Sequence, residues 1–288
     1  MVGIGTWQYN DTVAEAAVSL ALSVGYNHID TAIGYDNQVG IARALKATSR
    51  PRSSIFVTSK IPGGLDFDTA TKTLEQSLAQ LGLDYVDMML IHYPATWKGV
   101  GGKAMRQAEW KAMENFYRAG KARAIGLSHY CESHIADILE VATVRPMINQ
   151  VQYHVGMGAP STSGVNATDM PVPSSPSTQP SYEGITYQSF SPLCGPCGDV
   201  DHFKLINGSM VSKIGLAHGK SGAQVSLKWQ VQRGIPVIPK TSTKAFMVEN
   251  LDLFDWELTA AEMATLDAAS SPAVAGDPDG SSGDCKIL

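Results

Sequence analysis

Short runs of apolar residues alternate with longer amphipathic stretches along most of the chain. Short runs rich in β-branched and aliphatic residues are typical of buried strands, and apolar residues spaced three and four apart are typical of helices. The pattern predicts eight strands, at residues 2–6, 26–29, 55–59, 86–91, 123–127, 148–152, 186–190 and 236–238. It predicts helices at residues 13–23, 38–46, 69–80, 107–118, 132–141, 210–218, 223–232, 244–250 and 259–268.

The order of these elements predicts the fold. Strands separated by helices pair in parallel through helical crossovers. Eight such units in a chain of 288 residues predict an α/β fold, a (β/α)8 TIM barrel with parallel strands. We expect one domain over residues 1–270 and a flexible tail over residues 271–288. An open doubly wound sheet is the alternative, but it favours a glycine fingerprint, and Gly3-Ile4-Gly5-Thr6-Trp7-Gln8 lacks the third glycine.

One segment interrupts the alternation of strands and helices. Residues 156–184 are rich in Ser, Pro, Thr and Gly, show no helical period, and contain prolines that block a continuous helix. We therefore expect one crossover helix to be degraded to an irregular loop that runs over the outside of the barrel.

Capping residues mark two of the predicted helix starts. Asn37 is the predicted N-cap of the helix at residues 38–46. Thr259 and Glu262 have the spacing of a capping box at the start of the last helix.

The bulk composition argues against several classes of function. The net charge of −5 gives no electrostatic reason to expect a nucleic-acid partner. No apolar run approaches the ~18 residues of a membrane span, and the N-terminus lacks the pattern of a signal peptide. The four cysteines do not form a disulfide scaffold, and the histidines lack the spacing of metal ligands. We expect a cytoplasmic monomer without a metal site, a membrane partner or a nucleic-acid partner.

Polar side chains stand where three of the predicted strands end. Asp30 closes one apolar run and Tyr35 follows five residues later, while Lys60 and His92 close the next two runs. Because the carboxyl ends of parallel neighbouring strands share one rim, we expect an acid, a phenol, an amine and an imidazole to converge there. That set can donate a proton near neutral pH, and few structural roles require it.

These residues and their flanking sequences resemble the aldo-keto reductase family. The resemblance rests first on Asp30-Thr31-Ala32 with Tyr35, on Lys60, and on Ile91-His92-Tyr93-Pro94. Further matches in family order are Gly3-Ile4-Gly5-Thr6-Trp7-Gln8, Lys121-Ala122-Arg123-Ala124-Ile125-Gly126-Leu127-Ser128, Asn149-Gln150 and Pro239-Lys240-Thr241. The resemblance covers the chain from residue 2 to about residue 270. It implies a (β/α)8 barrel that binds NADPH in extended form without a Rossmann domain.

The resemblance assigns the four polar residues to carbonyl reduction, a reaction that needs a hydride at carbon and a proton at oxygen. A tyrosine has an unperturbed pKa of ~10, so Tyr35 is a protonated but sluggish acid near neutral pH. We expect the charge of Lys60 to lower the pKa of Tyr35, and Asp30 to keep Lys60 charged and oriented. His92 is expected to hydrogen-bond the carbonyl oxygen.

The resemblance also implies an NADPH site at the carboxyl-terminal rim of the barrel, with NADH as a weaker alternative. The positions that match the family's cofactor residues are Gly5, Thr6, Ser128, His129, Gln150, Phe190, Ser191, Leu193, Lys240, Thr241, Ser242, Thr243, Phe246, Glu249 and Asn250. Ser128 and Gln150 match residues that bond the nicotinamide carboxamide. Ser191-Pro192-Leu193 matches the pyrophosphate loop, and Lys240 with Thr241 matches the grip on the 2′-phosphate.

Three of these positions depart from the family pattern. His129 stands where the family usually has asparagine, and Phe190 replaces a tyrosine that stacks under the nicotinamide. Phe246 replaces an arginine over the adenine and its phosphate, so a bidentate phosphate contact is lost. We therefore expect a smaller preference for NADPH over NADH than is usual. Glu249 and Asn250 match residues that meet the adenine amine.

The expected substrate is an aldehyde or activated ketone, with Trp7 and Trp97 as candidates for its pocket. Two other functions stay open. One is a nucleotide-binding regulatory subunit on the same barrel, as in the family's potassium-channel β relatives, which the intact catalytic set disfavours. The other is a thiol oxidoreductase, because Cys194-Gly195-Pro196-Cys197 has the thioredoxin C-x-x-C sequence. That motif normally opens a helix, and residues 198–201 are a poor helix start.

Overall fold

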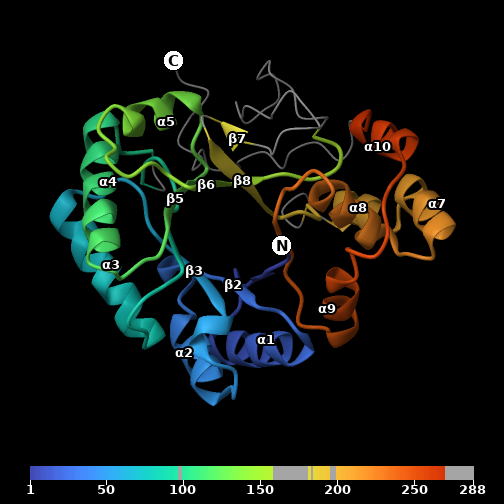
Figure 1. Ribbon diagram of the computed structural model, residues 1–288, viewed down its shortest axis with the longest axis horizontal. Coiled ribbons are helices and arrows are strands. Elements are labelled where there is room, and N and C mark those ends of the chain that lie inside the picture. Colours follow the sequence, from blue (N-terminus) through green and yellow to red (C-terminus); the bar gives the residue numbers. More distant parts are fainter. Residues whose placement is uncertain (97–98, 158–180, 183, 195–198, 270–288) are drawn as a thin grey trace.

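The computed structural model describes residues 1–288 except 97–98, 158–180, 183, 195–198 and 270–288. Within the described residues, a ring of strands is surrounded by helices (Figure 1). The strands are β1 (Ile4–Gly5), β2 (His28–Asp30), β3 (Phe56–Ile61), β4 (Met88–Ile91), β5 (Ile125–Ser128), β6 (Ile148–Gln152), β7 (Ser181–Tyr182), β8 (Ile185–Phe190) and β9 (Val237–Ile238). Eight of these nine strands pair in parallel, and β7 pairs antiparallel with β8.

The parallel strands close into a barrel. Their order is β1-β2-β3-β4-β5-β6-β8, and β9 pairs with β8. Val2, beside β1, forms an isolated parallel bridge to Val237 of β9, and the amide of Gly3 donates to the Val237 carbonyl at 2.9 Å. These contacts join the last strand to the first, and they confirm the predicted (β/α)8 TIM barrel.

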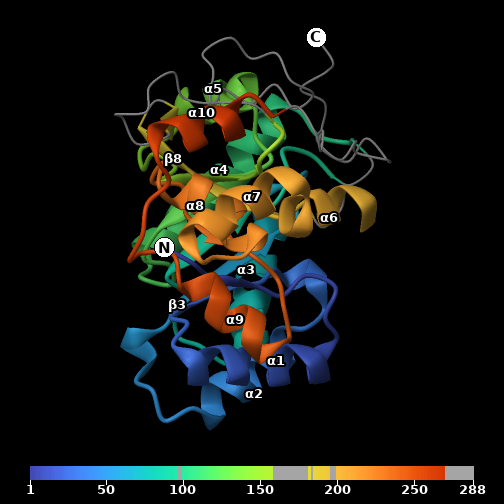
Figure 2. The ribbon, with the colours of Figure 1, turned by 90° about the vertical axis from the view of Figure 1, so that its right-hand side faces the viewer.

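Helices cover the outside of the ring (Figures 1 and 2). They are α1 (Asp11–Val24), α2 (Gln38–Ala47), α3 (Phe67–Leu81), α4 (Lys103–Arg118), α5 (Glu132–Leu139), α6 (Asp199–Asn207), α7 (Ser209–His218), α8 (Gly222–Val231), α9 (Lys244–Leu251) and α10 (Ala260–Asp267), with short 3-10 helices η1 (Ile33–Tyr35) and η2 (Arg52–Ser54). Every strand and helix that the sequence predicts is present, with ends that differ by at most four residues. The capping box of Thr259 and Glu262 is also present at the start of α10.

α6 is a helix that the sequence does not predict. The interpretation of residues 198–201 as a poor helix start is wrong, because α6 begins at Asp199. Leu205 of α6 is buried, and its carbonyl accepts a hydrogen bond from Ser226 Oγ of α8 at 2.6 Å. A Cβ at Gly222 of α8 would lie 2.5 Å from the Ile206 carbonyl oxygen, so glycine permits the close approach of the two helices. Packing on α8 therefore stabilises a helix whose first turn carries no clear signal.

Asn37 has a different role from the predicted one. It stands at the N-cap position of α2, but its side chain makes no capping hydrogen bond there. Its Nδ2 instead donates to the Thr6 carbonyl at 2.8 Å and to the Tyr9 carbonyl at 3.0 Å, and its Oδ1 accepts from Thr31 Oγ1 at 3.0 Å. Asn37 thus ties the segments after β1 and β2 to each other at the carboxyl-terminal rim.

Two of the expectations fall on parts of the chain that the structure leaves undescribed. Most of residues 156–184 and the whole tail at 271–288 lie outside the described residues. Within the first segment the structure describes β7, in which Tyr182 pairs with Ile185 of β8. The degraded crossover helix and the flexible tail stay predictions.

Side chains along β3 point alternately toward the surrounding helices and into the barrel. Ser59 Oγ donates to Gln38 Oε1 of α2 at 2.6 Å, so this residue faces the helices. Its neighbours Thr58 and Lys60 point the other way, into the barrel, because successive side chains of a strand lie on opposite faces. Thr58 contacts His28 of β2 there, with Oγ1 and Nε2 3.0 Å apart. The apolar core therefore lies between strands and helices, and polar side chains fill the barrel toward its rim.

Among the described residues, no helix is both long and apolar enough to cross a membrane.

A buried carboxyl group supports the loop after β3. Glu109 of α4 accepts a hydrogen bond from the Leu65 amide through Oε1 at 2.7 Å. Its Oε2 is buried without a partner among the described residues. Burial raises the pKa of Glu109 to about 8, although hydrogen bonds from the amides of Leu65 and Gly64 oppose the shift.

The protein is expected to lose stability as the pH rises toward the pKa of Glu109. The folded-state pKa of about 8 lies above the usual value, so the folded state binds more protons and stability falls with rising pH in this window. From about pH 6.5 to about pH 8.5 the loss should be on the order of 2 kcal/mol. Glu109→Gln should remove that loss, and thermal unfolding at both pH values measures it. Parallel pH dependences for the two proteins would contradict the assignment.

Candidate active site

The four polar residues predicted to converge do meet at one rim of the barrel. Asp30 ends β2, Lys60 stands one residue before the end of β3, and His92 follows β4. Tyr35 ends η1, the short helix after β2. Parallel pairing of Asp30 with Thr58 and of Lys60 with Leu90 brings the carboxyl ends of the three strands to the same end of the barrel.

Lys60 is the centre of this group. Its Nζ donates to Asp30 Oδ1 at 2.5 Å, to the Thr31 carbonyl at 3.0 Å and to the Tyr35 hydroxyl at 3.4 Å. The side chains of Lys60 and Asp30 are buried, with exposed fractions of 0% and 2%. Burial lowers the pKa of Lys60, and the negative charge of Asp30 opposes that shift. The ion pair thus holds an ammonium beside the phenol.

The pKa of Tyr35 differs from the sequence-based expectation. Burial raises the pKa of Tyr35 well above its usual value, and the negative charge of Asp30 raises it further. The net shift of the Tyr35 pKa is opposite to the lowering expected from the charge of Lys60, because burial, the largest cause, and the charge of Asp30 dominate. Tyr35 therefore holds its proton firmly at physiological pH.

His92 is held neutral beside Tyr35. The two rings meet edge to face, with centroids 5.5 Å apart and an interplanar angle of 72°. Burial lowers the pKa of His92 well below its usual value, and the charges of Lys60 and His129 lower it further. A neutral imidazole still carries one N–H donor, so His92 can hydrogen-bond an oxygen without bringing a charge.

A row of rings extends from His92 across the rim. His92 stacks on Tyr93 with centroids 4.5 Å apart, Tyr93 lies 4.4 Å from His129, and His129 lies 4.7 Å from Phe190. His129 has a left-handed backbone with φ 60°. The row places two of the predicted cofactor residues, His129 and Phe190, on one wall with His92. Tyr93 was missed as a site residue, although it directly follows His92.

Gln150 lies in the predicted region but contacts the ion pair. Its Nε2 donates to Asp30 Oδ2 at 2.7 Å and to Gln188 Oε1 at 2.8 Å. Its backbone carbonyl accepts from Ser128 Oγ at 2.9 Å. Gln188 of β8 is buried and was not predicted. A glutamine inside a predicted strand, in the same register as Gln150 of the preceding strand, is the signal that could have found it.

The other predicted cofactor residues lie around the ends of β1 and β9. Lys240 Nζ donates to Gln8 Oε1 at 2.9 Å and lies 6.0 Å from the Trp7 ring centroid. Burial lowers the pKa of Lys240. Gly5 and Thr6 are adjacent, and Thr6 Oγ1 donates to the Asp30 carbonyl at 3.0 Å.

α9 begins beside Lys240 without a side-chain cap. Thr243 is its N-cap residue and makes no capping hydrogen bond through its side chain, while its amide donates to Thr241 Oγ1 at 3.1 Å. Ser242 stands between them. Uncapped amides at a helix N-terminus favour an anion.

The remaining positions are spread over α9 and the loop after β8. Phe246 is 55% exposed and Trp7 is 46% exposed, so both can be reached from solvent. Asn250 is buried, and Glu249 Oε2 accepts from Ser221 Oγ at 3.4 Å. Ser191 has a left-handed backbone with φ 47° and starts a turn that includes Leu193, in which the Cys194 amide donates to the Ser191 carbonyl at 2.8 Å. Trp97 lies outside the described residues.

Neither described cysteine presents a thiolate in this structure. Cys131 and Cys194 are both buried, and each is disulfide-bonded. Cys197 and Cys285 lie outside the described residues. Disulfides are unusual in the cytoplasm, so the expected location stays a prediction.

In the part of the chain that the structure describes, no group of acidic, histidine and cysteine side chains could hold a metal ion.

Comparisons with known proteins agree with this fold. A sequence model described as the aldo/keto reductase family matches residues 1–162. The chain is 33% identical over 268 residues to the glyoxal reductase of Bacillus subtilis, covering 92% of this chain and 87% of that protein. It is 31% identical over 290 residues to aldo-keto reductase family 1 member A1 of Cricetulus griseus, covering 93% and 85%.

Solved structures give the same result. MGS-M4, an aldo-keto reductase from a Medee basin deep-sea metagenome library, superposes with a TM-score of 0.81 at 30% identity, covering 95% of this chain and 92% of that one. The aldose reductase from Schistosoma japonicum superposes with a TM-score of 0.76 at 28% identity, covering 93% and 88%. These matches define the chain as an oxidoreductase. This chain belongs to the aldo/keto reductase family.

Proposed function

We propose that this protein reduces small aldehydes or activated ketones to alcohols, with NADPH as the hydride donor and Tyr35 as the proton donor. The observation that carries the proposal is the buried contact of Lys60 with both Asp30 and the Tyr35 hydroxyl. The names of relatives, which include a glyoxal reductase, favour a short and reactive carbonyl substrate.

The described residues at the rim fit a nicotinamide cofactor. NADPH supplies the hydride when it is bound. Phe190 and His129 offer a ring surface beside the tetrad of Asp30, Tyr35, Lys60 and His92, at the carboxyl ends of β5 and β8. Lys240 has a neutral partner, Gln8, and stands beside the uncapped start of α9, so a cation and helix amides are available to a phosphate. The family uses nicotinamide cofactors, and this donor set favours the phosphorylated form.

The raised pKa of Tyr35 is compatible with a role as general acid. His92 donates its N–H to the carbonyl oxygen and places that oxygen against the Tyr35 hydroxyl. Reduction at carbon turns the oxygen into an alkoxide, a far stronger base than a phenolate, which therefore takes the proton from Tyr35. Lys60, 3.4 Å from the hydroxyl, then stabilises the phenolate that is left. Lys60 therefore stabilises the Tyr35 phenolate that forms on proton transfer, and Asp30 keeps Lys60 charged and oriented toward it.

An aldehyde panel assayed with NADPH distinguishes this proposal from its rivals. We expect wild-type protein and Cys194→Ser to oxidise NADPH at similar rates with at least one short aldehyde or dicarbonyl. Activity that disappears in Cys194→Ser would favour thiol chemistry. Tight NADPH binding without turnover on any member of the panel would favour a regulatory nucleotide-binding role.

Phe246→Arg is expected to increase the preference for NADPH over NADH. An arginine there would restore a charge-assisted contact to the 2′-phosphate, so the preference should rise by about tenfold or more. Titration of both cofactors by tryptophan quenching measures it. Phe254→Arg is the matched control, because Phe254 is also exposed and receives the same charge. Equal tightening of the two cofactors by Phe246→Arg would show that this residue is not at the 2′-phosphate.

Gln188→Met is expected to slow reduction without weakening NADPH binding. The change removes the acceptor for Gln150 Nε2 and loosens the amide that holds Asp30 Oδ2. Loss of one neutral hydrogen bond is worth about 1 kcal/mol, so kcat should fall by about fivefold. Steady-state kinetics and cofactor titration test this together. A change in cofactor affinity with an unaltered kcat would place Gln188 in the binding site instead.

A further inference from the structure

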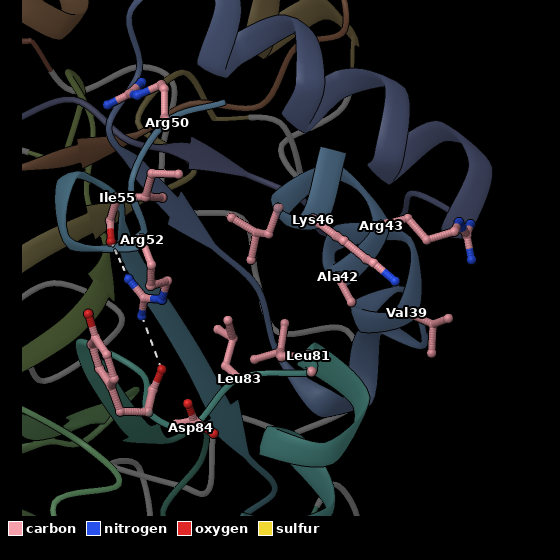
Figure 3. Close-up of a pocket in the computed structure, with 13 residues that line it drawn as sticks. Val39, Ala42, Arg43, Lys46, Arg50, Arg52, Ile55, Leu81, Leu83 and Asp84 are labelled. Carbon is pink, nitrogen blue, oxygen red and sulfur yellow. Dashed lines mark hydrogen bonds between the residues drawn. The ribbon is translucent and has the colours of Figure 1, made fainter. Parts of the chain in front are cut away.

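A groove lies at the opposite end of the barrel from the tetrad. It is lined by α2, by the segment that precedes β3, and by the end of α3 with the turn into β4, and its volume is about 490 Å³ (Figure 3). Ile55 immediately precedes β3 and Tyr85 comes shortly before β4, so this α2–α3 groove is at the amino ends of the strands. Lys60 and His92 stand at the carboxyl ends. The groove is therefore separate from the candidate active site.

The walls of the α2–α3 groove are apolar. The aliphatic residues that line it are Val39, Ala42, Leu45, Ile55, Leu81 and Leu83. Figure 3 shows Ala42 on the α2 side and Leu81 and Leu83 on the opposite side. Val39 is 47% exposed, a large value for a valine beside a hollow. Pockets of roughly 300–1,000 Å³ with apolar walls are the size that small organic ligands fill.

The rim of the groove is positively charged. Arg43, Lys46, Arg50 and Arg52 line it, against Asp84 as the acidic residue of the lining. Carboxylates neutralise some of these four cations but not the others.

Two of the cations are paired with acids. Arg43 Nε contacts Glu15 Oε2 at 2.6 Å. Arg52 Nη2 contacts Asp87 Oδ2 at 2.7 Å, and the same aspartate lies 3.3 Å from Arg123. Asp87 thus faces two arginines, and one positive charge remains on that side.

The other two cations are without an acidic partner among the described residues. Arg50 donates to the backbone carbonyls of Leu22, Tyr26 and Ser54, which fix its guanidinium without neutralising it. Lys46 forms no ion pair with any described side chain, and it projects from α2 beside Ala42 (Figure 3). An apolar wall next to unneutralised cations suits a ligand with an apolar body and one negative end.

We propose that the α2–α3 groove binds a small amphipathic carboxylate, with an aliphatic body of medium length against Leu81 and Leu83 and its carboxylate at Lys46. The walls exclude a bare inorganic anion as the preferred ligand, because it would leave the apolar surface exposed to water. The volume of about 490 Å³ favours a small molecule over the helix of a partner protein, which needs a longer groove.

Calorimetric titration with decanoate tests the proposal on the full chain. Decanoate should bind, and affinity should rise about threefold for each methylene added from hexanoate upward, as burial in an apolar groove requires. Decanol and acetate should each bind at least about tenfold more weakly, because each lacks one of the two features. Affinity that does not depend on chain length, or absence of binding by decanoate, would overturn the proposal.

Two variants locate the bound carboxylate. Lys46→Gln should weaken decanoate binding by about three- to tenfold. Ala42→Trp should fill the groove and abolish binding, and the melting temperature shows whether that variant is folded. Lys213→Gln is the matched control, since it removes the same charge from an exposed site on α7. Unchanged affinity in Lys46→Gln, or equal weakening in Lys46→Gln and Lys213→Gln, would show that decanoate binds elsewhere and would overturn the proposal.

Discussion

Replacing Tyr35 with phenylalanine is expected to lower kcat for carbonyl reduction by at least about 10². The change removes one hydroxyl and leaves the ring that packs edge to face on His92. Substrate and cofactor can still bind, but the alkoxide then has no positioned proton donor. Steady-state kinetics with NADPH and the best aldehyde of the panel measure the loss, and tryptophan quenching measures cofactor affinity.

Tyr117→Phe is the control for this experiment. It removes a hydroxyl from α4, outside the tetrad, and should leave both kcat and cofactor affinity unchanged. If Tyr35→Phe also retains turnover close to that of the wild type, Tyr35 is not the acid.

Replacing Lys60 with methionine is expected to lower kcat by a similar factor, about 10². The reason differs from that for Tyr35→Phe. In Lys60→Met the proton donor Tyr35 is present, but the phenolate formed on proton transfer loses the ammonium that stabilises it. The same change leaves Asp30 buried without its partner, which is expected to cost about 3–5 kcal/mol of stability. Kinetics and thermal unfolding together separate the two effects.

The double variant Lys60→Met with Asp30→Asn separates the loss of stability from the loss of kcat. It removes the unpaired carboxylate, so stability should recover in part while the loss in kcat persists. Recovery of turnover in the double variant would mean that Lys60 serves stability and not proton transfer.

The alternation of short apolar runs and amphipathic stretches was sufficient to predict the barrel. Parallel strands separated by helices allow few arrangements, and the strand ends place Asp30, Lys60 and His92 on one rim. Local signals also found the capping box of Thr259 and Glu262. These features could be predicted because each depends on residues close together in sequence.

What the sequence did not predict depends on contacts between distant residues. α6 forms because Leu205 and Gly222 pack two helices together, which its own first turn does not signal. Gln188 reaches Gln150 only because β6 and β8 are neighbours. The direction of the pKa shift of Tyr35 follows from burial and from the distance to Asp30, and neither is readable from residue types.

The same limit applies to the α2–α3 groove. Arg50 and Lys46 are ordinary basic residues in the sequence. They become notable only because Arg50 is bound by backbone carbonyls and both lie beside apolar walls in the folded chain. A charge without an acidic partner cannot be recognised before the fold is known.

A single-turnover experiment tests the central claim most directly. Wild-type protein loaded with NADPH is mixed rapidly with an excess of a short aldehyde, and the absorbance of the reduced nicotinamide is followed beside the same reaction of Tyr35→Phe. The account predicts that the wild type consumes its bound NADPH in a fast phase and forms the alcohol, and that the fast phase of Tyr35→Phe is slower by at least about 10². Equal fast phases in the two proteins, or no consumption of NADPH by the wild type, would contradict it.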